Sequence, residues 1–139
     1  VYRRYDASGN AVEITGKDGT PVSFLWSYNN CFPIARIENA TIDEVCAALE
    51  IESADEWTYD SVPDSDVRVR IDSLRELLPD ARVTTYEYVS LHGVTAITDP
   101  NGVTTRFDYD NYSRLTDNYY LDANARKVML QKYVYHFGK

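Results

Sequence analysis

Two stretches of the chain, residues 83–100 and 103–120, follow the same plan at an offset of about twenty residues. Each begins with Val-Thr-Thr, continues into an alternating aromatic pair, and then passes through a turn into a second strand-like segment. The aromatic pairs are Tyr86 with Tyr88, and Phe107 with Tyr109. Because side chains alternate between the two faces of a strand, each stretch predicts an antiparallel hairpin with its aromatic rings on one face. Repetition of that unit predicts a meander sheet.

Three other segments carry weaker versions of the same plan: residues 2–16, 18–37 and 122–138. The second of them predicts a strand with three aromatic residues on one face, Phe24, Trp26 and Tyr28. The last predicts a closing strand with alternating Tyr133, Tyr135 and Phe137. Hairpins of one general type are therefore expected over most of the chain.

A helical insert is expected to interrupt the strands. Thr41 with Glu44 three residues later forms a capping-box pattern, and helical spacing follows at Ile42, Val45, Cys46 and Leu49. A second helix is predicted within residues 64–80, with Pro79 ending it and an apolar face made of Val67, Ile71, Leu74 and Leu78. The acidic, turn-rich segment 52–66 between the two helices is expected to be a mobile loop.

These elements predict a mainly β fold of the β-rich α+β class, an antiparallel meander with a two-helix insert. The 139 residues fit a single domain that can bury a core without metals. Its expected parts are N-terminal hairpins over 1–38, the helical insert over 39–80 and a C-terminal meander over 81–139.

Charge and composition narrow the function. A formal net charge of −8 opposes binding to a phosphate backbone, so we expect no nucleic-acid partner. No apolar run is long enough to span a bilayer, and no signal-peptide pattern opens the sequence. Cys31 and Cys46 do not make a disulfide framework, and we expect two buried or half-buried free thiols.

One unit has a recognisable motif, a glycine followed by aromatic-x-Tyr-Asp-x-x-x-Arg-Leu. The residues that carry it are Gly102, Phe107, Tyr109, Asp110, Arg114 and Leu115. This unit resembles the YD repeat of RHS-repeat proteins, and the whole chain is similar to the C-terminal YD-repeat region of Bacteroidetes RHS proteins. The resemblance implies a secreted or cell-surface protein, of a family in which many repeats form a hollow β-shell that encloses a toxin.

Catalysis and cofactor binding find no support in the residues. The two histidines, His92 and His136, accompany no nucleophile motif and no paired carboxylates, so we expect no enzyme and no cofactor. Oxygen ligands gather near one hairpin at Asp99, Asn101, Asp108 and Asp110. They lack the spacing of a known calcium loop, and ordinary turn formation is favoured over a metal site.

The interaction predictions concern sheet edges and aromatic rings. We expect neighbouring repeats of the same chain, or self-association, to pair with the edges of the sheet. As an alternative function, exposed rings would stack on glycans; the candidates are Trp26, Tyr28, Tyr86 and Tyr88, although core packing is the favoured role for such rings. The pair Asp110 and Arg114 is hypothesised to stabilise the corner between two strands through a carboxylate–guanidinium contact.

Overall fold

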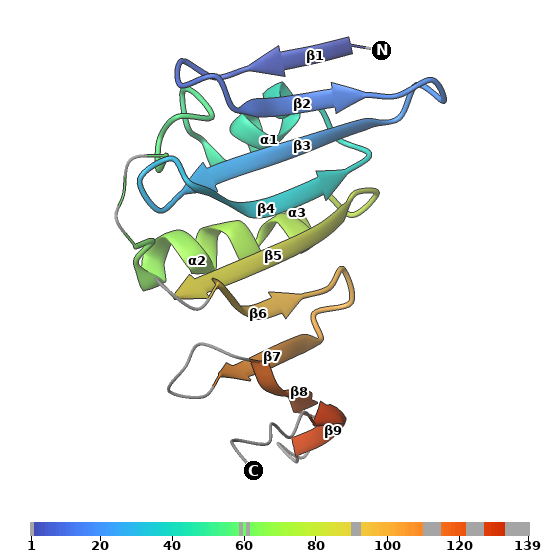
Figure 1. Ribbon diagram of the computed structural model, residues 1–139. Helices are drawn as coiled ribbons and strands as arrows, with labels where there is room; N and C mark the ends of the chain where they lie inside the picture. Colours follow the sequence, from blue (N-terminus) through green and yellow to red (C-terminus); the bar gives the residue numbers. More distant parts are fainter. Residues whose placement is uncertain are drawn as a thin grey trace. The chain divides into compact units, whose positions relative to one another are not determined.

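The computed structural model describes residues 2–58, 60, 62–89, 93–109, 115–121 and 127–132. The chain forms two compact units, Val1–Thr85 and Tyr86–Lys139. Strands pair with their neighbours in chain order, β1 to β9, and every pairing that is described is antiparallel. The predicted mainly β fold with a helical insert is therefore confirmed (Figure 1).

The first unit is built on five strand segments. They are β1 (Tyr2–Tyr5), β2 (Ala11–Thr15), β3 (Pro21–Ser27), β4 (Phe32–Glu38) and the beginning of β5 (Arg82–Val89). The helical insert connects β4 to β5 and lies on one face of this sheet (Figure 1). We call this the helix-covered face, and the opposite side of the same strands the open face.

Helix α1 (Ile42–Leu49) begins as its sequence predicts. Thr41 is the N-cap, its Oγ1 accepts from the Glu44 backbone N–H at 3.2 Å, and the Glu44 carboxylate accepts from the Thr41 N–H at 3.2 Å. Both halves of the capping box are present. The side chains of Ile42, Val45 and Leu49 are buried.

The second predicted helix is divided into α2 (Ser65–Asp72) and the short α3 (Leu74–Leu77). The Asp64 carboxylate caps α2 by accepting from Val67 N–H at 2.9 Å. The break falls at Ser73, whose hydroxyl donates to the Arg70 carbonyl oxygen. Serine side chains compete in this way with the helical hydrogen-bond ladder, which explains the division.

The core of the first unit lies between the helices and the helix-covered face. Leu25 and Ile37 of β3 and β4 are completely buried, as are Val45, Leu74 and Val83. Ser23 is also buried on this face, and its Oγ donates to the Ala40 carbonyl at 2.7 Å. The predicted face of Val67, Ile71 and Leu74 is buried, whereas Leu78 is only half-buried.

The connection between α1 and α2 differs from the mobile loop expected from its acidity. Trp57 and Thr58 are buried, and the Trp57 ring receives the Arg70 guanidinium at 5.3 Å from its centroid. Backbone hydrogen bonds also run from Asn29 N–H to the Asp60 carbonyl at 2.8 Å and from Asn30 N–H to the Thr58 carbonyl at 2.7 Å. The described part of this segment is thus anchored to the β3–β4 turn.

That turn contains two further departures from the sequence prediction. Tyr28 does not continue the aromatic row of β3, because it has left the strand with a φ of 55° and is buried. Its hydroxyl accepts a hydrogen bond from the Arg68 guanidinium at 2.6 Å. Cys31, expected to be buried or half-buried, is an exposed free thiol, whereas Cys46 is half-buried and free as expected.

The second unit contains the rest of β5 and the strands β6 (Gly93–Thr98), β7 (Thr104–Tyr109), β8 (Leu115–Leu121) and β9 (Lys127–Lys132). The alternating triad predicted at Tyr133, Tyr135 and Phe137 lies outside the described residues, as do His92 and His136. None of the described helices has the length and apolar character needed to cross a membrane.

Candidate interaction surfaces

The β6–β7 turn is held by Asp99. One carboxylate oxygen of Asp99 accepts from the backbone N–H groups of Asn101 and Val103, each at 2.9 Å. The Gly102 N–H donates to the Asp99 carbonyl at 2.9 Å, and Gly102 has a φ of 85°. Asp99 therefore acts on the backbone as a turn-forming residue. Over the described ranges, no group of three or more His, Cys, Asp or Glu side chains is arranged to hold a metal ion.

Tyr109, the tyrosine of the motif, connects two strands. Its hydroxyl donates to the Val94 carbonyl oxygen on β6, and burial raises the pKa of the phenol above its ordinary value. Tyr109 also faces Leu115 of β8, beside a register shift that follows Asp108. The Asp110 and Arg114 positions lie outside the described residues, so their corner contact stays a prediction.

Charged groups fix β1, the first strand in the order of the sheet, to helix α1. The Arg4 guanidinium donates to the Asp43 carboxylate at 3.0 Å and lies 4.0 Å from the carboxylate of Glu13. Glu13 is only 4% exposed, and it accepts from the Ile42 N–H at 2.8 Å. A buried carboxylate on β2 thus supports both the first turn of the helix and the strand beyond it.

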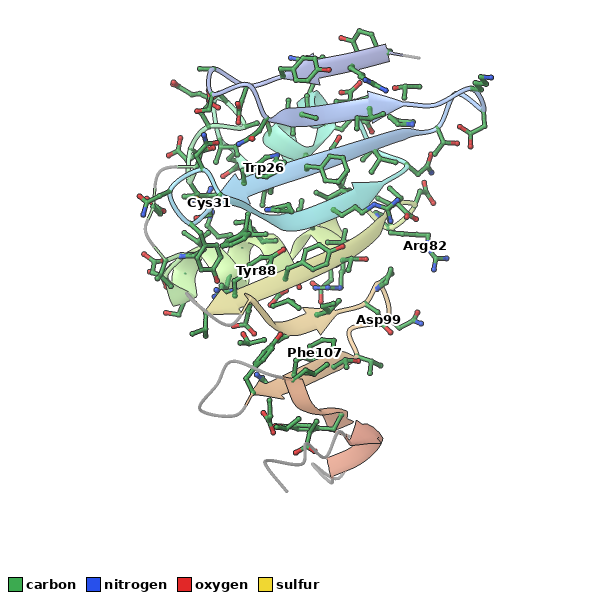
Figure 2. All side chains as sticks on the ribbon, viewed as in Figure 1. Trp26, Cys31, Arg82, Tyr88, Asp99 and Phe107 are labelled. Atoms are coloured by element: carbon green, nitrogen blue, oxygen red, sulfur yellow. The ribbon has the colours of Figure 1, made fainter. Side chains whose placement is uncertain are left out.

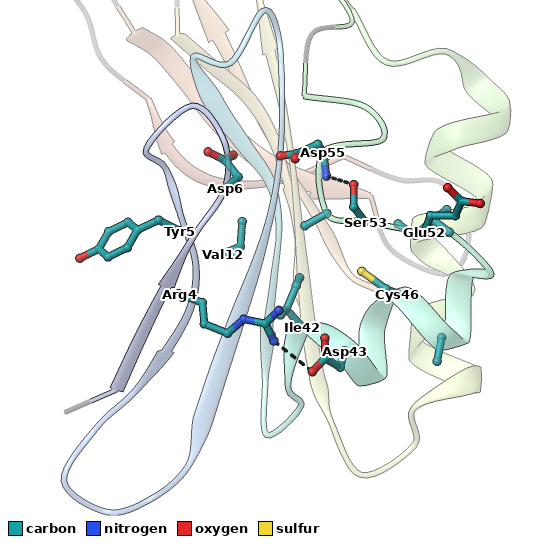
Figure 3. A pocket seen from close by; sticks show the side chains of 13 residues that line it. Arg4, Tyr5, Asp6, Val12, Ile42, Asp43, Cys46, Glu52, Ser53 and Asp55 are labelled. Atoms are coloured by element: carbon teal, nitrogen blue, oxygen red, sulfur yellow. Dashed lines mark hydrogen bonds and ion pairs between the residues drawn. The ribbon is translucent and has the colours of Figure 1, made fainter.

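A cavity of about 410 Å³ opens between β1, α1 and the start of the following loop (Figure 3). Arg4, Asp43 and the half-buried Cys46 line it together with apolar side chains that include Val12 and Ile42. Burial raises the pKa of the Cys46 thiol, which disfavours the reactive thiolate. No histidine is among the described residues that line this cavity. Cys46 therefore has no histidine there that could act as a base and activate its thiol as a nucleophile.

Residues 90–118 match the family model described as RHS Repeat. The matched segment includes β6, β7 and the Asp99 turn, together with all six residues of the Gly-aromatic-Tyr-Asp-Arg-Leu motif. This segment is similar to an RHS repeat. No curated protein matches the chain. The resemblance found from the motif is confirmed for the RHS family, and the described contacts of its repeat are structural: a turn held by Asp99 and a strand tie made by Tyr109.

Gly102 gives a test of the RHS turn. Alanine at this position would meet no atom within 4 Å, so its cost is expected to come from the positive φ alone. We expect Gly102→Ala to lower the free energy of unfolding by about 1 kcal/mol. Gly16→Ala, where φ is not positive and the nearest atom is 3.5 Å away, is the matched control and should be close to neutral. Equal effects in denaturant unfolding would contradict the strain argument.

The four glycan-stacking candidates fall in two different settings. In the first unit, Trp26 lies on β3 (Figure 2), and its Nε1–H donates to the Ala11 carbonyl at 2.8 Å. Tyr28 is buried, with its ring 6.0 Å from that of Phe32. In the second unit, Tyr86 and Tyr88 are half-buried and stacked, with ring centroids 6.4 Å apart. Among the four candidates, Tyr86 and Tyr88 are the two whose rings lie beside each other.

A shallow trough of about 660 Å³ lies elsewhere in the second unit. The side chains of Phe107, Tyr109 and Tyr119 contribute aromatic surface to it, and Arg106 and Asp117 contribute charge. One carboxylate oxygen of Asp117 is buried and has no hydrogen-bond partner among the described residues. Aromatic and polar groups are thus brought together on strands β7 and β8.

The two thiols should differ in reactivity. We expect iodoacetamide to modify exposed Cys31 rapidly at pH 7.5, whereas half-buried Cys46 with its raised pKa reacts more slowly. Because a raised pKa delays formation of the thiolate, the rate at Cys46 should continue to rise at alkaline pH. Peptide-resolved mass spectrometry over a pH series measures both rates; equal rates at pH 7.5 would contradict the description of Cys46.

Sequence reasoning missed the network of Arg4, Glu13 and Asp43. The sequence of β2 provides a signal, because Glu13 stands between the apolar residues Val12 and Ile14 in a predicted strand. An acidic residue at such a position requires a partner. Finding that partner depends on knowing that Arg4 lies directly opposite Glu13.

Proposed function

We propose that the chain is a non-enzymatic structural and interaction module that extends its sheet by pairing with a further strand. One observation carries the proposal: β1 stands at the end of the strand order, and among the described strands it pairs with β2 alone. A strand paired on one side leaves alternate backbone N–H and C=O groups available along its outer edge. Strand addition uses those groups for affinity.

The remaining geometry supports a structural role. Consecutive hairpins build the sheet, and each strand added at an end would repeat the antiparallel pairing already present. The described motif residues make turn and inter-strand contacts, as a scaffold requires: the Gly102 N–H donates to the Asp99 carbonyl, and the Tyr109 hydroxyl donates to the Val94 carbonyl. In the parent protein, the added strand would belong to a neighbouring repeat.

The wider setting follows from the RHS family. We place the module in a secreted or cell-surface RHS protein, and more specifically in the YD-repeat region of a Bacteroidetes protein. In such a protein the module would contribute to a β-shell of the type associated with toxin encapsulation and delivery. The RHS repeat supports this setting.

Strand addition is tested with a short synthetic peptide of alternating Thr and Val flanked by Tyr. We expect saturable chemical-shift changes at the backbone amides of β1 when the peptide is added to the full chain. The control peptide carries N-methyl groups on alternate residues, which removes the donors of one edge. Binding at β1 that is lost on methylation supports the proposal; the absence of binding by both peptides rejects it.

Carbohydrate binding is the second candidate, favoured by the stacked pair Tyr86 and Tyr88. Paired rings present flat, amphipathic surface of the kind on which sugar rings stack. A broad glycan array, repeated with Tyr86→Ala and Tyr88→Ala, tests this function. Signals that disappear in both variants would support it, whereas an array without signals would remove it.

A further inference from the structure

The side chains along the outer edge of β1 have unequal electrostatic environments. Arg3 and Arg4 are its only charged residues, in a chain whose formal net charge is −8. Arg4 points to the helix-covered face, where Asp43 and Glu13 surround it. Arg3 is exposed on the open face, and no ion pair links it to any residue within the described ranges.

The strand register places Arg3 at the end of a cross-strand row on the open face. Directly opposite neighbours lead from Arg3 to Ile14, then to Val22, Glu38 and Arg82. Side chains in such a row are near enough to interact across each pair of strands. The row therefore begins with Arg3 and ends with Arg82, and its one carboxylate, that of Glu38, lies next to Arg82.

The two arginines at the ends of this row differ in their neighbours. Arg82 faces Glu38 across β4 and β5, with 3.6 Å between Nε and the carboxylate, and Arg36 also contacts that carboxylate. Arg3 faces only the apolar Ile14 on its inner side. Its outer side, where the next strand of the sheet would lie, is the one place on the row where a carboxylate could face it.

We propose that the segment which pairs with the outer edge of β1 is an extended protein strand carrying a carboxylate opposite Arg3. This inference rests on the proposed strand addition and names the chemistry of the partner. Opposite charges at directly facing positions stabilise a strand pair, and like charges destabilise it. The partner needs no acidic residue on the helix-covered face, because Arg4 already has two carboxylates there.

The same charges disfavour a second copy of this chain as the occupant. In a symmetric antiparallel pairing of two β1 strands, facing side chains lie on the same face of the sheet, so the register centred on Arg3 places the Arg3 side chains of the two copies opposite each other. These like charges repel, so the edge disfavours a second copy of itself while favouring an acidic strand. An acidic strand from another segment meets both conditions, because it places a carboxylate opposite Arg3 and brings no second arginine to that position.

The inference is tested with two peptides of one design, binding to the full chain and detected at the β1 amides by NMR. The acidic peptide has Glu at every second position, and the neutral peptide has Gln at the same positions. We expect the acidic peptide to bind roughly twofold to fivefold more tightly at low ionic strength, as an exposed ion pair allows. The difference should shrink when salt is added.

Two charge-reversal variants separate Arg3 from the overall charge. Arg3→Glu should remove the preference for the acidic peptide and create one for a Lys-containing peptide. Lys17→Glu, an equal change of charge at an exposed site outside β1, should leave the preference for the acidic peptide. Equal responses of the two variants would overturn the inference, because they would indicate a non-specific effect of net charge.

The remaining outcomes distinguish this inference from the proposed function. Equal binding of the acidic and neutral peptides at β1 would overturn the inference that the partner strand is acidic, but it would still support the proposed strand addition. Binding of neither peptide would reject both. A concentration-dependent dimer by light scattering, with protected β1 amides and no response to Arg3→Glu, would make a second copy the occupant and overturn the inference.

Discussion

Leu25→Ala is expected to lower the free energy of unfolding of the first unit by about 3–5 kcal/mol. Leu25 is 0% exposed, lies on the central strand β3, and faces the core beneath the helices. Truncation loses the transfer free energy of the side chain and leaves a cavity that the sheet and helices fill only partly. Urea unfolding monitored by tryptophan fluorescence measures the loss.

Leu77→Ala is the matched control for that substitution. Leu77 is 51% exposed at the end of α3, so removing the same atoms should change the free energy of unfolding by no more than about 0.5 kcal/mol. If both variants lost the same stability, the core would not lie where the structure places it. If neither lost stability, the packing between helices and sheet would not contribute to folding.

Glu13→Ala is expected to cost about 2–3 kcal/mol. The substitution leaves the buried Ile42 N–H without its acceptor and removes one of the two carboxylates near Arg4. An unsatisfied buried donor costs its full desolvation penalty, which exceeds the net gain of an ordinary hydrogen bond. Thermal and urea unfolding of the variant measure the cost.

Glu13→Gln and Glu52→Ala make this prediction specific. Glutamine keeps an acceptor for the Ile42 N–H and should recover a large part of the lost stability. Glu52 is exposed, and its replacement should be nearly neutral. The account of the α1 N-terminus would be wrong if Glu13→Gln were as damaging as Glu13→Ala.

Local patterns in the sequence were sufficient for the architecture. Alternation at period two predicted the strands, and turn residues such as Asp99 and Gly102 predicted where hairpins close. The capping box at Thr41 and Glu44 predicted the start of α1 to the residue. In each case, residues only a few positions apart make the contacts that decide the structure.

The missed features depend on contacts between distant parts of the chain. Tyr28 leaves the aromatic row because its hydroxyl meets Arg68, forty residues later. Trp57 is buried in an acidic segment, and the Arg70 guanidinium, thirteen residues later, lies over its ring. Neither partner is indicated by periodicity or turn chemistry, so single-sequence patterns favoured a longer aromatic row and a mobile loop.

The candidate surfaces also include one feature that a local sequence pattern predicts and one that depends on contacts between distant residues. The residues of the RHS motif, from Gly102 to Leu115, lie close together in the sequence, so a local pattern is enough to predict them. The electrostatic difference between Arg3 and Arg4 was not visible, because adjacent arginines look equivalent in a sequence. Only the strand register places Arg4 opposite Glu13 and Arg3 opposite Ile14.

The most direct test of the central claim is residue-resolved amide hydrogen exchange on the free chain. The claim is that β1 has an open outer edge, whereas β3 is paired on both sides. The account predicts that the outward-facing amides of β1 exchange much faster than the amides of β3. Protection of all β1 amides equal to that of β3 would show that the edge is already covered, and would contradict the account.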